Sequence, residues 1–199
     1  IDQPLDEAMD RLDAIGTRTS NTNYPWGWAQ VGNTPGKRYK QNTHGGGVRD
    51  PLIVSWPNGI DQEASGGIRT QFHHVVDLAP TILELVGSAS PDEIGGVAQQ
   101  PIEGTSLVYT FDTKAEDAGA VPTRKEIQYF EMQGHRALWH DGWKAVAYHR
   151  YGTSLDDDVW ELYHLDEDFS ECRDLADAQP ERLAGMVDRF WEEAERYDV

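Results

Sequence analysis

The stretch IQYFEMQGHRALWHDGWKAVAYH, residues 127–149, decides the fold of the last third of this chain. Its segments IQYFEM, RALWH and WKAVAYH carry the aromatic and β-branched residues that favour strands. The turn His140-Asp141-Gly142 joins the second segment to the third as a hairpin, because Asp-Gly adopts positive φ at low cost. A further strand is expected at VWELYHL, residues 159–165. We therefore predict a small antiparallel sheet of about four strands.

A helix is expected after the sheet, beginning at Pro180. Its apolar residues recur at i, i+3, i+4, i+7, i+8 and i+11, which places them on one continuous face. They are Leu183, Met186, Val187, Phe190, Trp191 and Ala194. This face most simply covers the sheet, so residues 124–199 are predicted to be a C-terminal antiparallel-sheet subdomain with a terminal helix.

Residues 1–110 are predicted to be the end of an α/β sheet domain. The run Leu52-Ile53-Val54, between two prolines, indicates a short buried strand. The segment HHVVDLAPTILELVG, residues 73–87, indicates a helix with Asp77 as its cap and Gly87 at its end. Its buried stripe is expected to be Leu78, Ile82, Leu85 and Val86. A strand, a loop and a helix in this order suit the edge of an α/β sheet.

The other segments of the first half differ in character. Residues 5–15 have apolar side chains at helical spacing, and Gly16 is a suitable stop. Residues 17–51 are rich in Asn, Thr, Gly and Pro, hold large aromatic residues and show no periodicity, which predicts a long loop. A loop of this length inside a compact domain is uncommon and is usually functional. Residues 88–123 are also loop-like, so a boundary between subdomains is expected there.

Composition excludes some classes of partner. The 199 residues carry a formal net charge of −18, which repels nucleic acid and anionic membrane surfaces. No segment is long and apolar enough to span a bilayer. We therefore expect neither nucleic acid nor a membrane as partner. The single cysteine, Cys172, cannot form an internal disulfide, and the start of the chain has neither an initiator Met nor a signal-like segment. We expect a piece of a longer protein, and its compartment, cytoplasmic or periplasmic, stays open.

Three polar groups are weak candidates for chemistry. Cys172 lies in an acidic stretch, where neighbouring carboxylates oppose thiolate formation. His73, His74 and Asp77 lack a third metal ligand, because only one of the histidines shares a helical face with the aspartate. The run Asp156–Asp158 lacks the alternating acids and the glycine of a calcium loop. A structural or solvated role is the simpler interpretation of each, and no metal ligand is assigned within this chain.

A fourth group is more suggestive. Lys40, His44 and Arg49 lie close in sequence to the glycine triplet 45–47. Three cationic side chains around flexible backbone suit an anion. The triplet alone is weak evidence, since no P-loop or dinucleotide spacing surrounds it. The alternative is a loop whose charges merely face water.

Three motifs, taken in order, resemble signatures of the sulfatase family. YKQNTHGGGVRDPLIVSWP, residues 39–57, is similar to the family's Lys, short spacer, Gly-Gly-x-Arg-x-Pro and strand ending in Trp-Pro. HHVVDLAPTILELVG resembles its Asp-x-x-Pro-Thr-x-Leu helix, and WELYHLDEDFSECRDLA, residues 160–176, its Glu-Leu-Tyr-x-Leu ending, with Asp174 in place of the usual Asn. NYPWGWAQVGNTP, residues 23–35, further resembles bacterial arylsulfatases. The chain is thus similar to the C-terminal portion of sulfatases, which belong to the alkaline phosphatase superfamily.

The resemblance implies a formylglycine nucleophile and a calcium ion, both held by residues upstream of the matched region. Cys172 does not fit the nucleophile motif. One active-site residue carries over, since Lys40 matches the lysine that binds a sulfate oxygen. A fixed ammonium stabilises the charge that develops in sulfuryl transfer. His44, Trp26 and Trp28 are candidates to line the approach of an aromatic substrate.

Three hypotheses about function follow. The first is the C-terminal part of an arylsulfatase, whose full-length form hydrolyses small-molecule sulfate esters while this chain alone is inactive. The second keeps the superfamily but makes the substrate a phosphate or phosphonate monoester. The third is a non-catalytic assembly module that self-associates through the apolar face left by the missing N-terminal part. The natural substrate and the oligomeric state stay open.

Overall fold

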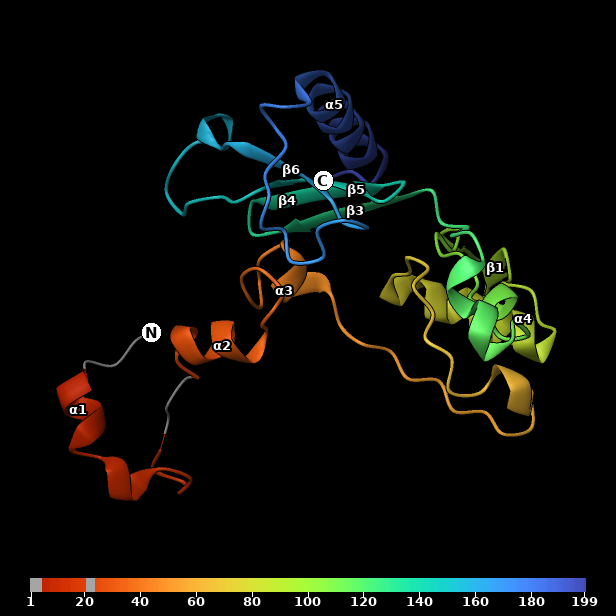
Figure 1. Ribbon diagram of the computed structural model, residues 1–199, viewed down its shortest axis with the longest axis horizontal. Helices are drawn as coiled ribbons and strands as arrows, with labels where there is room; N and C mark the ends of the chain where they lie inside the picture. Colours follow the sequence, from red (N-terminus) through yellow and green to blue (C-terminus); the bar gives the residue numbers. More distant parts are fainter. Residues whose placement is uncertain (1–4, 21–23) are drawn as a thin grey trace. The chain divides into compact units, whose positions relative to one another are not determined.

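The computed structural model describes residues 5–20 and 24–199, which form two compact units (Figure 1). The first unit contains the described residues up to Arg49 together with 130–138 and 143–199. The second contains 50–129 and 139–142. The predicted division into 1–110 and 124–199 concerns the domains of a longer protein and stays a prediction.

A four-stranded antiparallel sheet with strand order β3-β4-β5-β6 supplies most of the first unit. Its strands are β3 (Ile127–Met132), β4 (His135–His140), β5 (Trp143–Ala147) and β6 (Trp160–His164). Asp141 and Gly142 have φ values of 48° and 77°, so the Asp-Gly turn forms as predicted. The register of β5 and β6 pairs Trp143 with His164. The predicted sheet is confirmed.

The terminal helix α5 (Pro180–Arg196) covers one face of this sheet, and α3 (Gly45–Val48) lies on the other (Figure 1). The helix packs on β5 and β6. Three residues of its predicted apolar face are buried, namely Met186, Phe190 and Ala194. The Phe190 ring meets that of Trp160 edge-on, with centroids 5.2 Å apart. The antiparallel sheet packed on a C-terminal helix is therefore the architecture expected from the sequence.

The segment predicted to be one long loop, 17–51, contains two short helices. They are α2 (Trp26–Gly32) and α3, and they follow α1 (Leu5–Met9) and a 3₁₀ turn, Leu12–Ala14. Sequence reasoning missed α2 because it contains two glycines and two tryptophans, which have low helix propensity, and no buried stripe. A last 3₁₀ turn of the first unit is Leu155–Asp157.

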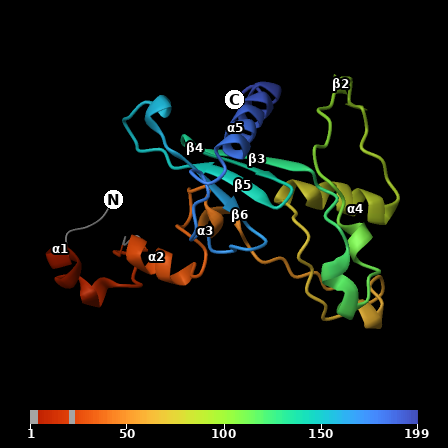
Figure 2. The same ribbon diagram turned by 45° about the horizontal axis from the view of Figure 1, so that its top comes forward.

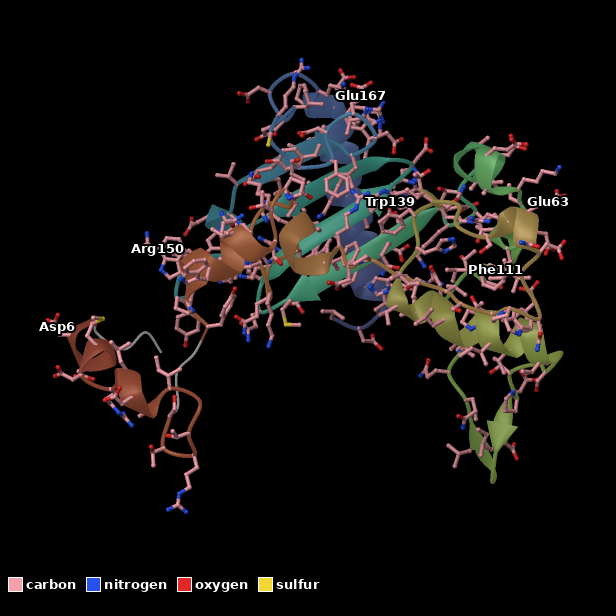
Figure 3. All side chains as sticks on the ribbon, turned by 60° about the horizontal axis from the view of Figure 1, so that its bottom comes forward. Asp6, Glu63, Phe111, Trp139, Arg150 and Glu167 are labelled. Carbon is pink, nitrogen blue, oxygen red and sulfur yellow. The ribbon has the colours of Figure 1, made fainter. Side chains whose placement is uncertain are left out.

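The second unit is built around α4 (Leu78–Val86), which ends at Gly87 with φ 66°, as predicted. A hairpin of two very short strands, β1 (Glu93–Ile94) and β2 (Val97–Ala98), extends beyond α4 within this unit (Figure 2). The remaining regular elements are 3₁₀ turns at Gln62–Ala64, Val75–Asp77, Val108–Thr110 and Ala115–Ala120. Phe111 lies in the small interior of this unit, and Glu63 lies at its surface, where it pairs with Lys114 (Figure 3).

Two predictions for the second unit are wrong. Residues 51–56 have no regular secondary structure, and Ile53 in the expected buried strand is 90% exposed. The expected buried stripe of α4 is exposed as well, since Ile82 and Val86 are 59% and 68% exposed. A strand needs a neighbour for its backbone hydrogen bonds, and an apolar stripe needs a second layer. The described residues provide neither at this place. Thr81 is the residue of α4 that is buried.

None of the helices within residues 5–20 and 24–199 has the length and apolar content needed to cross a membrane.

Candidate functional site

The segment 37–49, which carries Lys40, is folded tightly on itself. The Gly46 amide donates to the Lys37 carbonyl oxygen at 2.7 Å. A Cβ atom on Gly46 would lie 2.1 Å from the Arg38 carbonyl oxygen, and one on Gly47 would lie 2.0 Å from that of Asn42. Backbone therefore passes where a side chain would be, and both positions require glycine. Packing thus accounts for two of the three glycines in the triplet.

Glu161 on β6 holds this segment to the sheet. The Lys37 ammonium donates to Glu161 Oε2 at 2.7 Å and to the Tyr163 hydroxyl at 2.7 Å. The Tyr163 hydroxyl in turn donates to Glu161 Oε2. His44 Nε2 lies 3.2 Å from the same carboxylate oxygen. Residues more than a hundred positions apart in the chain therefore meet at one carboxylate.

The charges at this carboxylate follow from burial and hydrogen bonding. Burial raises the pKa of Glu161, but hydrogen bonds from His44, Lys37 and Tyr163 outweigh it and hold that pKa well below its ordinary value. Burial lowers the pKa of His44, which the bond to Glu161 offsets only in part. Burial and the neighbouring Glu161 carboxylate raise the pKa of Tyr163. At neutral pH we assign a charged Glu161 and a neutral His44 whose Nε2 carries the proton.

Glu171 holds the far end of the segment. The Gly45 amide donates to Glu171 Oε2 at 2.7 Å, and the Lys144 ammonium donates to Oε1 at 2.7 Å. Glu171 and Lys144 are both buried, and burial lowers the pKa of Lys144. The Arg49 guanidinium lies 3.7 Å from the centre of the Phe169 ring. Below, Glu161 and Glu171 are called the two anchors of the segment.

The structure places the predicted site residues as follows. Lys40 is exposed, and its side chain has no hydrogen bond or ion pair with any residue that the structure describes. His44 is completely buried. Trp26 and Trp28 lie on α2 and are 65% and 61% exposed. Lys40 and His44 thus share one anchored segment while the tryptophans lie on a separate helix, and the substrate roles of all four residues stay predictions.

Sequence reasoning did not predict the contacts of the two anchors, although both lie in the third motif. A usable signal existed for Glu161, which is a carboxylate between two apolar residues of a strand, Trp160 and Leu162. A charge at such a position is buried at a cost unless it is paired. The pairing partner, Lys37, is 124 positions away, so the sequence did not indicate which cation it was.

Asp77, the residue that opens the second motif, is the buried polar centre of the second unit. Its carboxylate accepts hydrogen bonds from the His74 amide, the Thr105 amide and the Lys125 ammonium, each at 2.8 Å. His73 Nδ1 lies 3.2 Å from Asp77 Oδ2, the oxygen that also receives the His74 amide. Burial raises the pKa of Asp77, but these bonds hold it well below its ordinary value. The Asp77 side chain therefore completes the capping box of the 3₁₀ turn Val75–Asp77, whose N-cap is His74, and makes no capping hydrogen bond to α4.

Within residues 5–20 and 24–199, no group of three or more His, Cys, Asp or Glu side chains is arranged to hold a metal ion. The paired His73 and Asp77 illustrate why, because the carboxylate is already occupied by Lys125 and two backbone amides. The residues present do not fit a calcium site, and we derive no step through a metal. The predicted calcium ion and formylglycine concern residues upstream of this chain.

Residues 36–196 match the protein family described as N-sulphoglucosamine sulphohydrolase, C-terminal. An uncharacterized sulfatase of Schizosaccharomyces pombe is 28% identical over 192 residues, which cover 94% of this chain and 32% of that protein. Arylsulfatase K of Xenopus laevis is 25% identical over 154 residues, which cover 74% of this chain and 26% of that protein. The chain thus spans a minor part of the length of the curated relatives it matches.

Solved structures have the same fold at lower identity. The crystal structure of Ps i-CgsB has a TM-score of 0.60 and 22% identity, and the match covers 80% of this chain and 32% of that one. BT4656, solved in complex with its substrate D-glucosamine-2-N,6-O-disulfate, has a TM-score of 0.50 and 21% identity, with 74% and 28% covered. These likenesses concern the fold alone.

Proposed function

We propose that this chain, which belongs to the sulfatase family, is the C-terminal part of an arylsulfatase. The family membership rests on the match to the region described as N-sulphoglucosamine sulphohydrolase, C-terminal. The full-length enzyme hydrolyses sulfate esters, so that water is added, the ester is cleaved, and an alcohol and sulfate are released. The observation that carries the proposal is the segment 37–49. It contains the first part of the first sulfatase motif, residues 39–49, and is anchored to two residues of the third motif, with Lys40 exposed between the anchored positions.

Lys40 is proposed to bind an oxygen of the sulfuryl group. Sulfuryl transfer develops negative charge on the equatorial oxygens and on the leaving oxygen. An ammonium held in one place stabilises that charge without having to reorganise. Three features support this role. Lys40 has no carboxylate partner among the described residues, it lies in a segment fixed at both ends, and no Asp or Glu occurs between Asp13 and Asp50.

The nucleophile and the calcium ion are proposed to lie in the part of the protein upstream of this chain. The isolated chain is accordingly proposed to be inactive. Incubating the purified chain with an aryl sulfate and measuring free sulfate tests this directly. Sulfate release at the rate of a complete sulfatase, in a preparation free of other proteins, would contradict it.

The substitution Lys40→Ala in the full-length enzyme tests the role of the lysine. We expect kcat/KM for p-nitrophenyl sulfate to fall by about 10²–10³, the usual effect of removing one group that stabilises transition-state charge. Lys114→Ala is the control, since this exposed lysine pairs with the exposed Glu63 on the second unit. Unchanged kcat/KM in Lys40→Ala would rule out the proposed role.

Substrate profiling of the same enzyme decides the class of ester. Aryl sulfates are the proposed class, and sulfated saccharides are the second class to assay, because the matched family is described as a sulphohydrolase of N-sulphoglucosamine. Faster hydrolysis of phosphate or phosphonate monoesters than of sulfates would instead favour the alternative within the superfamily.

A second candidate function, self-association, is favoured by the exposed apolar residues of the second unit. They include Leu52, Ile53, Ile82 and Val86. Exposed apolar surface of this kind drives association in water. We expect light scattering to detect oligomers of the isolated chain and fewer of them in the double variant Ile53→Asp, Ile82→Asp. A monodisperse monomer in both proteins would count against this function.

A further inference from the structure

We infer that Glu161 and Glu171 are positioning residues for Lys40. They fix the segment 37–49 to the sheet on either side of the lysine. The backbone at Lys40 is thereby held in one conformation, which limits the positions that the Lys40 ammonium can reach. Neither carboxylate acts on the substrate itself. The inference rests on the proposed role of Lys40 and adds the part of the protein that makes that role effective.

The first argument is the placement of the anchors along the segment. Lys37, three residues before Lys40, is held by Glu161. His44 and Gly45, four and five residues after it, are held by Glu161 and Glu171. The stretch that bears Lys40 is therefore closed at both ends by contacts with the sheet unit. The backbone between two such contacts has little freedom to move, so the position of the Lys40 Cα atom is restricted.

The second argument is the backbone on either side of the lysine. Arg38 and Gln41 have φ values of 65° and 76°, in the left-handed region that residues with a Cβ rarely adopt. Such conformations persist only where the surrounding structure imposes them, and they gather at sites of function. The two anchors hold the segment on both sides of Arg38 and Gln41, and the bond from Asn33 Nδ2 to the Arg38 carbonyl oxygen holds the backbone between them.

The third argument is the chemistry of the anchors. The Lys144–Glu171 pair is buried, whereas Lys37 and Glu161 are partly exposed. Ion pairs of either kind contribute little net stability, so we infer that the value of both lies in the geometry that they impose. Lys144 neutralises one oxygen of Glu171, and the other oxygen receives the Gly45 amide. Glu161 receives Lys37 and His44 at a single oxygen. Both carboxylates thus form hydrogen bonds with residues of this segment.

A double-mutant cycle in the full-length sulfatase tests whether Glu161 acts through Lys40. The variants are Lys40→Ala, Glu161→Gln and the two combined, assayed for kcat/KM with p-nitrophenyl sulfate. We expect Glu161→Gln alone to lower kcat/KM by about tenfold or more, and by less than about twofold in the Lys40→Ala background, because coupled residues are not additive. Lys37→Met, at a partly exposed position, is a second, milder variant that should show the same pattern.

Asp77→Asn is the matched control. Asp77, like Glu171, is a buried carboxylate that accepts hydrogen bonds from a lysine and from the protein backbone, but it belongs to the second unit. Any loss of activity in Asp77→Asn should be equal in both backgrounds. An equal loss for Glu161→Gln and Lys37→Met in both backgrounds would overturn the inference, whereas an unchanged Lys40→Ala would overturn the proposed function together with it.

Limited trypsin digestion of the 199-residue chain tests the anchoring without an activity assay. The segment offers cleavage sites at Lys37, Arg38 and Lys40. We expect Glu161→Gln to be cut there much faster than the parent chain, and Asp77→Asn to be cut there at the parent rate. Cleavage at these sites that is equally fast in the parent chain and in Glu161→Gln would show that the anchors do not hold the segment.

Discussion

Two helices of this chain, α5 in the first unit and α4 in the second, have similar sequence patterns and different surroundings. Both are amphipathic. On α5 the apolar residue Phe190 is 1% exposed because β5 and β6 lie against it. On α4 the apolar residue Val86 is 68% exposed because no layer among the described residues covers it. The difference teaches that a periodic pattern predicts an apolar helix face, whereas the burial of that face depends on a second packing layer, which the pattern does not identify.

The interiors of the two units differ in the same way. The first unit buries apolar strand residues completely, among them Leu138, Val146 and Leu162. The second unit has a small interior, in which the ring of Trp139 (labelled in Figure 3) stacks on that of Phe72 with centroids 3.9 Å apart. It depends more on the polar contacts of Asp77, which joins its turn, Thr105 and Lys125. The following predictions, in order of decreasing effect, test this contrast.

Asp77→Asn should have the largest effect, and the effect should be confined to the second unit. Removing one partner of a buried pair costs about 3–5 kcal/mol, because the remaining charge is left buried and uncompensated. Hydrogen exchange should show lost protection in α4, while amides of β5 and β6 keep theirs. If both regions lose protection together, the two units unfold as one and the contrast is wrong.

The same substitution, Leu→Ala, should have different effects in the two units. Leu162 on β6 is 0% exposed, so its truncation leaves a cavity and costs about 2–5 kcal/mol. Leu85 on α4 is 37% exposed, and its truncation should change stability by only about 0.5 kcal/mol or less. Urea unfolding of the two variants measures both values. Equal destabilisation would mean that α4 is buried against a partner in solution.

The pH dependence should show the smallest effect, with contributions from both units. Burial lowers the pKa of His44 in the first unit and of His74 in the second. The unfolded chain therefore binds more protons than the folded one as pH falls below the ordinary histidine value of about 6.5, and stability decreases. Thermal unfolding should thus show a lower Tm at pH 5.5 than at pH 7.5, with a shallower slope in His44→Gln.

The carboxylates extend this loss to stronger acid. The pKa values of Asp77 and Glu161 lie well below their ordinary values, so their stabilisation is complete above the pKa of an unfolded carboxyl group, about 4, and is lost below it. A Tm that stays constant from pH 7.5 to pH 3 would show that neither the histidines nor the carboxylates differ between the folded and unfolded states.

Much of the four-stranded sheet and of α5 was predictable, because the signals are local. The aromatic and β-branched residues of β3 to β6, the Asp141-Gly142 turn and the apolar face after Pro180 each indicate an element from a few neighbouring residues. The family was also recognisable, since its motifs are contiguous in sequence. The strand at Leu52–Val54 and the buried stripe of α4 were predicted wrongly, because the pattern does not show whether a covering layer is present.

In the candidate site, too, the local features were predictable and the long-range contacts were not. The sequence by itself determined that Lys40 lies in a sulfatase motif, that Gly46 and Gly47 follow it and that the third motif begins in a strand, because each is a property of consecutive residues. Only the tertiary structure decided that Glu161 reaches Lys37 and that Glu171 reaches Gly45. The physical reason is that a buried charge needs a partner, and folding rather than sequence separation selects which one it meets.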